Sequence, residues 1–486
     1  MISYLPEPPA DIFWVGSNFN EASPALAKAG FRLSKAALVP DRVKVLEGAL
    51  FDAAVFYQSA NYFSHLPRVL KGIRRFIHDG GMLILCDALS EESPVYAQPP
   101  SYLSRKITIA LSESGFRILN QFDRKKPASA PGKCPVNDGV FVARKDKFRV
   151  RSYRKGDEQA IVSMFNEVFH TRRTMAHWYW KFRDNPFGSH RICLGQSENG
   201  ALVSQYAGYP LPFCSTLENT SHPTHFRTLH AGDTFTHPSV RRIGLGKTGL
   251  LARTTFYFYA AFLEGVVPFA FGFNTASVKK LGERYMGYQF ADAVICWEKD
   301  LSSGSLKRPG RVARLFSAYE VEEVFSVDET WNDFFDGVRS DYSFLVARDA
   351  AYVLWRYLEC PDRAHRLFAL RRKGLLVGWS VFSVKDDRIL WGDALFDRCR
   401  LKGVSFLLHH VVTQAFSGVK SIKAWFSKNP GWWQDYLLSL DFKPEPEADG
   451  LTLCYKSFGS PIMDARTVTE RLHHSFYYTW GDSDLF

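Results

Sequence analysis

The sequence predicts an α/β protein built from several units, each with its own central sheet. The chain has 486 residues, so about three domains of about 150 residues are expected. Hydrophobic residues make up 46% and charged residues 23%, which excludes a disordered chain, a collagen-like repeat and a coiled coil. Short apolar runs alternate with amphipathic segments, and part of this pattern occurs twice in the chain.

Strand and helix patterns alternate through residues 1–145. The predicted strands are residues 11–16, 51–57, 81–87 and 140–143, the last as an edge strand. The predicted helices are residues 21–30, 62–78 and 102–115. This order predicts a mainly parallel sheet with helices on both faces. Residues 122–136 are rich in charge and proline and are predicted to be an exposed connector.

Residues 51–87 resemble the second half of a class I S-adenosylmethionine-dependent methyltransferase, which implies a Rossmann-like domain. The resemblance rests on an FD strand, a helix, and a glycine pair before the next strand. Such an enzyme needs a glycine-rich turn after its first strand and an acid after its second. Here the turn reads VGSNFN at residues 15–20, and residues 31–36 contain no acid. We therefore expect a non-catalytic methyltransferase-like domain over residues 1–145, and the alternative is a divergent domain that still binds S-adenosylmethionine.

A glycine-containing turn stands between a strand and a helix in the middle of the chain. Residues 228–236 predict the strand, residues 249–263 predict a long apolar helix, and HPSVRRIGLGKT at residues 237–248 joins them. A turn of this kind directs backbone N–H groups and the positive end of the helix dipole to one place. That place suits a pyrophosphate.

This loop resembles the R-x-x-G-x-G/A coenzyme A signature of the GCN5-related N-acetyltransferase (GNAT) superfamily. The resemblance continues through a predicted strand at residues 267–274 and a helix at residues 276–284. It implies a GNAT-type domain with a mixed central sheet over residues 146–301, and acetyl-coenzyme A or another acyl-coenzyme A as donor. The residues implied to bind the donor are Phe235, Thr236, Arg241, Arg242, Ile243, Gly244, Leu245, Gly246, Lys247, Thr248 and Asn274.

Acyl transfer to an amine requires a base that removes a proton from the incoming ammonium. Asp233 and His230, on the strand before the loop, are the candidates for this role. The resemblance implies that Tyr285 protonates the leaving thiolate. For each of the three residues the alternative is a purely structural role.

A second GNAT-like unit is predicted over residues 310–457. The segment HWYWKFRDNP at residues 177–186 is repeated as VLWRYLECP at residues 353–361. Residues 271–290 are repeated in the same order at residues 424–442. Two repeats in one order predict a tandem duplication.

The second copy has a basic turn, residues 397–405, where the glycine signature would fall. We therefore expect this copy to shape the acceptor site rather than to bind the donor. Residues 302–311 are predicted to be a connector. Residues 458–486 form a C-terminal tail to which the sequence assigns no role.

Charge and cysteine spacing restrict the partners. Lys and Arg number 61 against 50 Asp and Glu, a formal charge of +11, which favours an anionic partner. The eight cysteines lie far apart, so neither a disulfide framework nor a metal site is expected. No segment reads as a membrane span or a secretory signal, and the expected location is the cytoplasm.

The leading function is therefore N-acyl transfer from acyl-coenzyme A to a small-molecule amine. The preferred acceptor is an amino sugar, nucleotide-linked, of a bacterial polysaccharide or envelope pathway. Aminoacyl transfer from charged tRNA is an allied function, against which the intact glycine signature argues. Two further functions stay open at this point: a non-enzymatic scaffold that keeps relic cofactor folds, and a bifunctional methyl and acyl transferase.

Overall fold

The computed structural model gives the chain two compact units. Unit 1 comprises Met1–Val168, Ile192–Tyr206 and Thr234–Phe262, and unit 2 comprises Phe169–Arg191, Ala207–Asp233 and Leu263–Phe486. The described residues are 5–16, 19–35, 37–39, 42–44, 49–57, 66–89, 100–125, 137–216, 224–244, 246–302, 319–362, 364–416 and 418–486. No helix among these residues is long and apolar enough to cross a bilayer.

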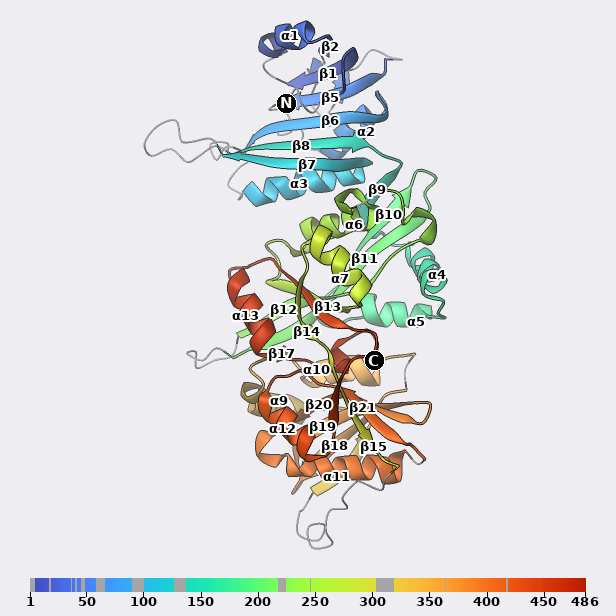
Figure 1. Ribbon diagram of the computed structural model, residues 1–486, viewed down its shortest axis with the longest axis vertical. Coiled ribbons are helices and arrows are strands. Elements are labelled where there is room, and N and C mark those ends of the chain that lie inside the picture. Colours follow the sequence, from blue (N-terminus) through green and yellow to red (C-terminus); the bar gives the residue numbers. More distant parts are fainter. Residues whose placement is uncertain are drawn as a thin grey trace, which may run out of the picture. The chain divides into compact units, whose positions relative to one another are not determined.

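Unit 1 contains a six-stranded mixed sheet in the order β2-β1-β5-β6-β8-β7 (Figure 1). Its strands are β1 (Ala10–Gly16), β2 (Phe31–Lys35), β5 (Phe51–Tyr57), β6 (Ile77–Leu89), β7 (Phe116–Lys125) and β8 (Asn137–Lys145). The first four strands in the order pair in parallel, whereas β8 is antiparallel to both neighbours. A separate hairpin joins β3 (Ala37–Val39) and β4 (Arg42–Lys44).

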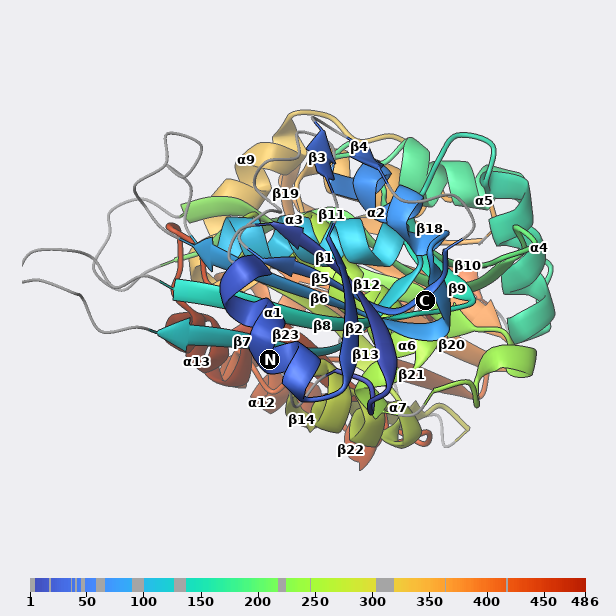
Figure 2. The same ribbon diagram turned by 90° about the horizontal axis from the view of Figure 1, so that it is seen from above.

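Helices cover both faces of this sheet because side chains alternate along its central strands. In β1, Ile12 and Trp14 pack with Leu26 of α1 (Phe19–Lys28). Phe13 and Val15 point to the other face, where they join the core formed with α2 (Leu66–Arg74) and α3 (Pro100–Glu113). Figure 2 shows α1 and α2 on opposite sides of the sheet. The strands are consequently apolar without a polar alternation.

Two predictions for residues 1–145 are corrected. Strand β8 is longer than predicted and lies inside the sheet, while the unpredicted strand β7 forms the edge. The predicted connector at residues 122–136 begins as the end of β7, and its remainder lies outside the described residues. Polar residues of β7 form a strand because the ladder to β8 satisfies their backbone groups over nearly the whole length of both strands.

A second sheet has the order β14-β23-β13-β12-β11-β10-β9, with β17 and β24 attached at β11. Its strands are β9 (Phe148–Ser152), β10 (Arg191–Ser197), β11 (Leu202–Ser215), β12 (Thr224–Thr236), β13 (Phe269–Asn274), β14 (Gln289–Ala293), β17 (Phe344–Val346), β23 (Thr452–Ser457) and β24 (Phe476–Tyr477). Its helices are α4 (Glu158–Phe169), α5 (Met175–Trp178), α6 (Leu250–Phe258) and α7 (Ala276–Leu281). Strands β12 and β13 pair in parallel, at Leu229 and His230.

The third sheet lies wholly in unit 2 and has the order β16-β18-β19-β20-β21-β15-β22. Its strands are β15 (Ile295–Asp300), β16 (Tyr319–Val324), β18 (Arg366–Arg372), β19 (Leu375–Lys385), β20 (Arg388–Phe396), β21 (Ser421–Trp425) and β22 (Lys443–Pro446). The accompanying helices are α9 (Thr330–Val338), α10 (Ala350–Val353), α11 (Lys402–His410) and α12 (Gly431–Ser439), whereas α13 (Ala465–His474) contacts β14, β23 and β24 of the second sheet. Strands β20 and β21 pair in parallel, as β12 and β13 do.

The third sheet contains one strand from the first predicted copy, and the second sheet contains two strands, β17 and β23, from the second predicted copy. Strand β15 was expected with residues 146–301 but pairs with β21 and β22. Strand β23 was expected with residues 310–457 but pairs with β13 and β14. Strand pairing depends on open sheet edges rather than on sequence order, so the pattern of residues within a strand does not reveal this exchange.

The predicted repeat of the Trp-containing segments is visible as a symmetric contact in unit 2. Helices α5 and α10 each continue into a π-helical turn, at Tyr179–Arg183 and Leu354–Leu358. The rings of Trp180 and Trp355 stack with centroids 5.2 Å apart. Each indole N–H donates to the backbone oxygen of the other tryptophan, at 2.7 and 3.1 Å. These tryptophans are thus core residues that join the two copies.

Candidate functional site

The predicted donor loop lies in unit 1 and leads from β12 into α6. His237 caps a short turn at Pro238–Val240 by accepting a hydrogen bond from the Ser239 N–H. Gly244 follows with a φ of 73°, and a Cβ there would lie 2.7 Å from the backbone oxygen of Thr248. Both the conformation and the close approach require glycine at position 244.

The end of the loop is open to an anionic ligand. Gly249 is the N-cap of α6 and has no side chain that could accept from the N–H groups of the first turn. Arg242 and Lys247 are exposed, so two positive charges accompany these backbone donors. Gly246 also has a positive φ, of 62°. Such a loop has the donors and charge that a pyrophosphate needs.

Several other residues predicted to bind acyl-coenzyme A already contact other residues of the protein. Arg241 Nε donates to the backbone oxygen of Thr236 at 2.9 Å, which braces the end of β12. The Thr236 hydroxyl lies 3.1 Å from the Ser204 hydroxyl. Phe235 is buried against Phe165. Ile243 is exposed, Thr248 is half-buried, and Leu245 lies outside the described residues.

Asp233 lies in a cluster of buried charges in unit 2. Its carboxylate pairs with the Arg173 guanidinium and, at 3.1 Å, with Lys181 Nζ. Burial raises the pKa of the Asp233 carboxyl, but Arg173 and Lys181 outweigh burial and hold that pKa below its ordinary value. Asp233 therefore stays ionised and compensates two cations, which makes it a poor proton acceptor.

His230 is the other predicted base, and it is placed differently. Its ring stacks on Tyr209 with centroids 5.0 Å apart and meets Phe271 edge to face. Neither ring nitrogen makes a hydrogen bond to any residue that the structure describes. Burial lowers the pKa of His230 to about 4, so the imidazole is neutral at neutral pH. A neutral imidazole carries the lone pair that a base requires, and both ring nitrogens of His230 are buried among the surrounding residues.

The C-terminal residues supply a second carboxylate to this cluster. Asp484 pairs with Lys181 at 2.9 Å and accepts a hydrogen bond from the Tyr209 hydroxyl at 3.0 Å. Its Oδ1 lies 3.8 Å from Nδ1 of His230. A Cβ on Gly232 would lie 1.9 Å from Oδ2 of Asp484, so this carboxylate fits because position 232 is glycine.

The second copy contains a matching cluster. Arg348 precedes α10 as Arg173 precedes α5, and it pairs with Asp393 at 3.0 Å as Arg173 pairs with Asp233. Asp393 follows Gly392 in β20, just as Asp233 follows Gly232 in β12. In this copy the place beside the glycine is filled, because a Cβ on Gly392 would lie 1.9 Å from the Phe486 ring.

Two further predicted residues make their described contacts outside the charge cluster. Asn274, the last residue of β13, donates from Nδ2 to the Cys454 sulfur of β23 at 2.7 Å. Tyr285 is half-buried in the turn after α7, with the Arg284 guanidinium over its ring. Among the described residues, Tyr285 makes no hydrogen bond to the charge cluster.

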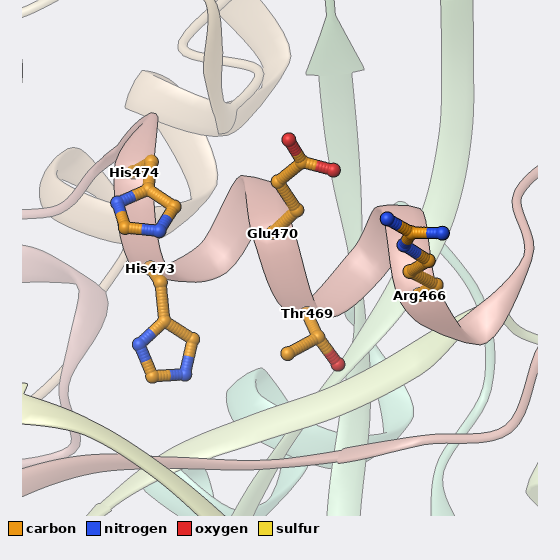
Figure 3. Close-up of a pocket in the computed structure, with 5 residues that line it drawn as sticks. All are labelled: Arg466, Thr469, Glu470, His473 and His474. Carbon is orange, nitrogen blue, oxygen red and sulfur yellow. The ribbon is translucent and has the colours of Figure 1, made fainter.

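A shallow hollow of about 450 Å³ lies along α13 (Figure 3). Its lining residues are Arg466, Thr469, Glu470, His473 and His474. Thr469 and His473 project to one side of the helix and Glu470 to the other. His473 Nε2 is 2.9 Å from the Tyr455 hydroxyl. Across the described ranges, no three His, Cys, Asp or Glu side chains are placed to hold a metal ion.

Sequence reasoning missed Arg173, Lys181, Tyr209 and Asp484 in the cluster. A signal was present in part: the dipeptide Gly-Asp occurs at the same place in both copies, at positions 232 and 392. Arg173 and Arg348 also stand at the same distance before Trp180 and Trp355. Asp484 has no such signal, because its partners are remote in sequence.

Comparison with known proteins gives similarity at the level of the fold. No protein-family model matches the chain, and no curated protein is similar to it in sequence. A probable N-acyltransferase from Enterococcus faecalis is 13% identical, with 64% of this chain and 72% of that chain covered and a TM-score of 0.47. A tandem GNAT protein from the clavulanic acid biosynthesis pathway is 11% identical, with 64% and 99% covered and a TM-score of 0.41. N-myristoyltransferase from Saccharomyces cerevisiae is 9% identical, with 70% and 85% covered and a TM-score of 0.42.

Similarity this distant carries no argument about the reaction of the present chain. The conclusions below therefore rest on the residues of the loop and of the charge cluster.

Proposed function

We propose that the protein is an N-acyltransferase that moves an acyl group from acyl-coenzyme A to a small-molecule amine. The observation that carries the proposal is the loop from His237 to Gly249. Its glycine at position 244, its uncapped helix start and its two exposed cations together suit a pyrophosphate. Acyl-coenzyme A, when bound, supplies a thioester that an amine can attack.

The residues of this chain would have separate tasks in that reaction. Backbone N–H groups at the start of α6, with Arg242 and Lys247, would hold the donor phosphates. His230, which is neutral and carries a free lone pair, would accept the proton of the acceptor ammonium. Asp233 would keep Arg173 and Lys181 in place. The acceptor favoured by the sequence resemblance is an amino sugar.

Replacing Gly244 with alanine is expected to weaken the binding of acetyl-coenzyme A at least tenfold, about 1.4 kcal/mol. Alanine is strained at a φ of 73°, and its Cβ would push the Thr248 backbone away from the loop. Calorimetric titration measures the affinity. The matched control is Gly156→Ala, because Gly156 has a φ of 102° but nothing within 4 Å of an added Cβ. The control variant should bind the donor as the wild-type protein does.

A parallel titration with S-adenosylmethionine separates the acyltransferase from a scaffold and from a bifunctional transferase. We expect no binding of this ligand, since we propose that the N-terminal sheet is non-catalytic. Absence of acetyl-coenzyme A binding by the wild-type protein would favour a scaffold, and binding of both ligands would favour a bifunctional transferase.

A further inference from the structure

The residues from Tyr478 to Phe486, here called the C-terminal segment, are fixed within unit 2. Arg356 donates from Nε to the backbone oxygen of Gly481 at 3.1 Å and from Nη2 to that of Ser483 at 2.9 Å. Arg348 Nη2 pairs with Asp482 at 2.6 Å. These side chains are buried, so the segment is a built part of the core.

The anchoring groups are the second copy's counterparts of the first copy's cluster. Arg348 corresponds to Arg173 and Arg356 to Lys181, since both pairs keep the spacing of the stacked tryptophans. Phe486 fills the place beside Gly392. The C-terminal segment therefore fills the position in the second copy that corresponds to the charge cluster of the first copy. One of its residues, Asp484, reaches the charge cluster of the first copy itself, where it lies beside Gly232.

We propose that Asp484 is a positioning residue for His230. Its carboxylate keeps the imidazole proton on Nδ1, so the lone pair stays on Nε2. That lone pair takes the proton of the substrate amine. The inference rests on the proposed function. A carboxylate beside one imidazole nitrogen selects the tautomer that places the proton there. The 3.8 Å between Asp484 Oδ1 and His230 Nδ1 is longer than a hydrogen bond, as catalytic contacts often are without substrate.

The surroundings of His230 single out Asp484. The charged groups that face the ring are Asp484 from the C-terminal segment, Lys181 and Arg356 from the two π-helical turns, and Asp233 from its own strand. Lys181 and Arg356 cannot accept a proton from Nδ1. Asp233 is engaged by Arg173 and Lys181. Asp484 also pairs with Lys181 and accepts from Tyr209, but its Oδ1 lies 3.8 Å from Nδ1 of His230. When His230 takes up a proton, Asp484 is the carboxylate beside it that offsets the new charge.

Nuclear magnetic resonance of the full chain labelled with nitrogen-15 histidine tests the proposal at neutral pH. The His230 signals are assigned by their loss in His230→Gln, and the nitrogen shifts report which ring nitrogen carries the proton. The wild-type protein is expected to have the proton on Nδ1. In Asp484→Asn the population is expected to move toward the Nε2-protonated tautomer, with kcat/KM for acetyl transfer from acetyl-coenzyme A to glucosamine, the amino-sugar probe, at least tenfold lower.

A second variant reaches the same carboxylate without removing it. In Gly232→Ala the new Cβ would displace Asp484, so the same tautomer change is expected. Leu485→Ala is the matched control, because Leu485 is the exposed neighbour of Asp484, and it should change neither tautomer nor rate. A wild-type His230 protonated on Nε2, or an unchanged tautomer in either folded variant, would overturn the proposal. The tautomer of His230 can be measured without bound acetyl-coenzyme A. Failure to bind acetyl-coenzyme A would therefore overturn the proposed function and leave the tautomer result to be judged separately.

Discussion

Replacing Arg348 with alanine is expected to lower the free energy of unfolding of unit 2 by about 3–5 kcal/mol. The Arg348 side chain is fully buried, and so are the carboxylates of Asp393 and Asp482 with which it pairs. Removing the guanidinium would leave two buried negative charges without compensation. Tyr357 and Thr479 donate hydrogen bonds to Asp393, but as neutral groups they cannot replace the lost charge.

Urea unfolding followed by tryptophan fluorescence measures this effect, because every tryptophan except Trp14 lies in unit 2. The matched control is Lys420→Ala, which removes an exposed ion pair with Asp387 and should cost less than about 1 kcal/mol. Adding Asp482→Asn to Arg348→Ala should restore part of the loss, because one uncompensated charge disappears. Equal losses in the Arg348 and Lys420 variants would show that Arg348 does not act through its charge.

The sequence predicts those features of this molecule that are local. The apolar runs at β1, β5 and β6 and the glycine loop at Gly244 are specified by neighbouring residues, and all are found. The repeat of Trp180 and Trp355 is also local, and it correctly indicated two related segments.

The remaining features depend on contacts between distant parts of the chain. Strand β7 ends in polar residues, and these are in a strand because β8 pairs with them. The exchange of β15 and β23 depends on which sheet edges are open. Lys181 and Asp484 are ordinary charged residues in the sequence, and their burial follows from pairing that no local pattern encodes. Four members of the charge cluster, Arg173, Lys181, Tyr209 and Asp484, were therefore not predicted, whereas Asp233 and His230 were singled out from their place on the strand, and their roles as bases stay predictions.

Acidification from pH 6.5 to pH 4 is expected to destabilise unit 2 through two buried histidines. Burial lowers the pKa of His177 and of His230 to about 4, against an ordinary value of 6.5. In this window the unfolded chain binds protons that the folded chain does not, so the free energy of unfolding falls as the pH falls. Each histidine contributes about 1.4 kcal/mol per pH unit, which amounts to about 3 kcal/mol over the window.

One buried acid acts in the opposite direction. Burial raises the pKa of Asp482 to about 6, so the folded chain holds a proton there that the unfolded chain releases. The stabilisation that Asp482 contributes to the folded chain is fully present below pH 3.8, the ordinary pKa of an aspartate. It is lost as the pH rises through about 6. Between pH 4 and pH 6 the pH dependence from Asp482 cancels that from about one of the two histidines. The pH dependence therefore has to be compared between single variants and the wild-type protein.

The measurement is the slope of the free energy of unfolding against pH, from urea titrations between pH 4.5 and 6. His177→Gln and His230→Gln should each reduce this slope by about 1.4 kcal/mol per pH unit, and Asp482→Asn should increase it by a similar amount. His474→Gln, at an exposed position of α13, serves as the control and should leave the slope as it is. If His230→Gln does not change the slope, His230 is charged in the folded chain. A charged His230 would lack the lone pair that a base requires. This stability experiment therefore also tests whether His230 is neutral, as the proposed reaction requires.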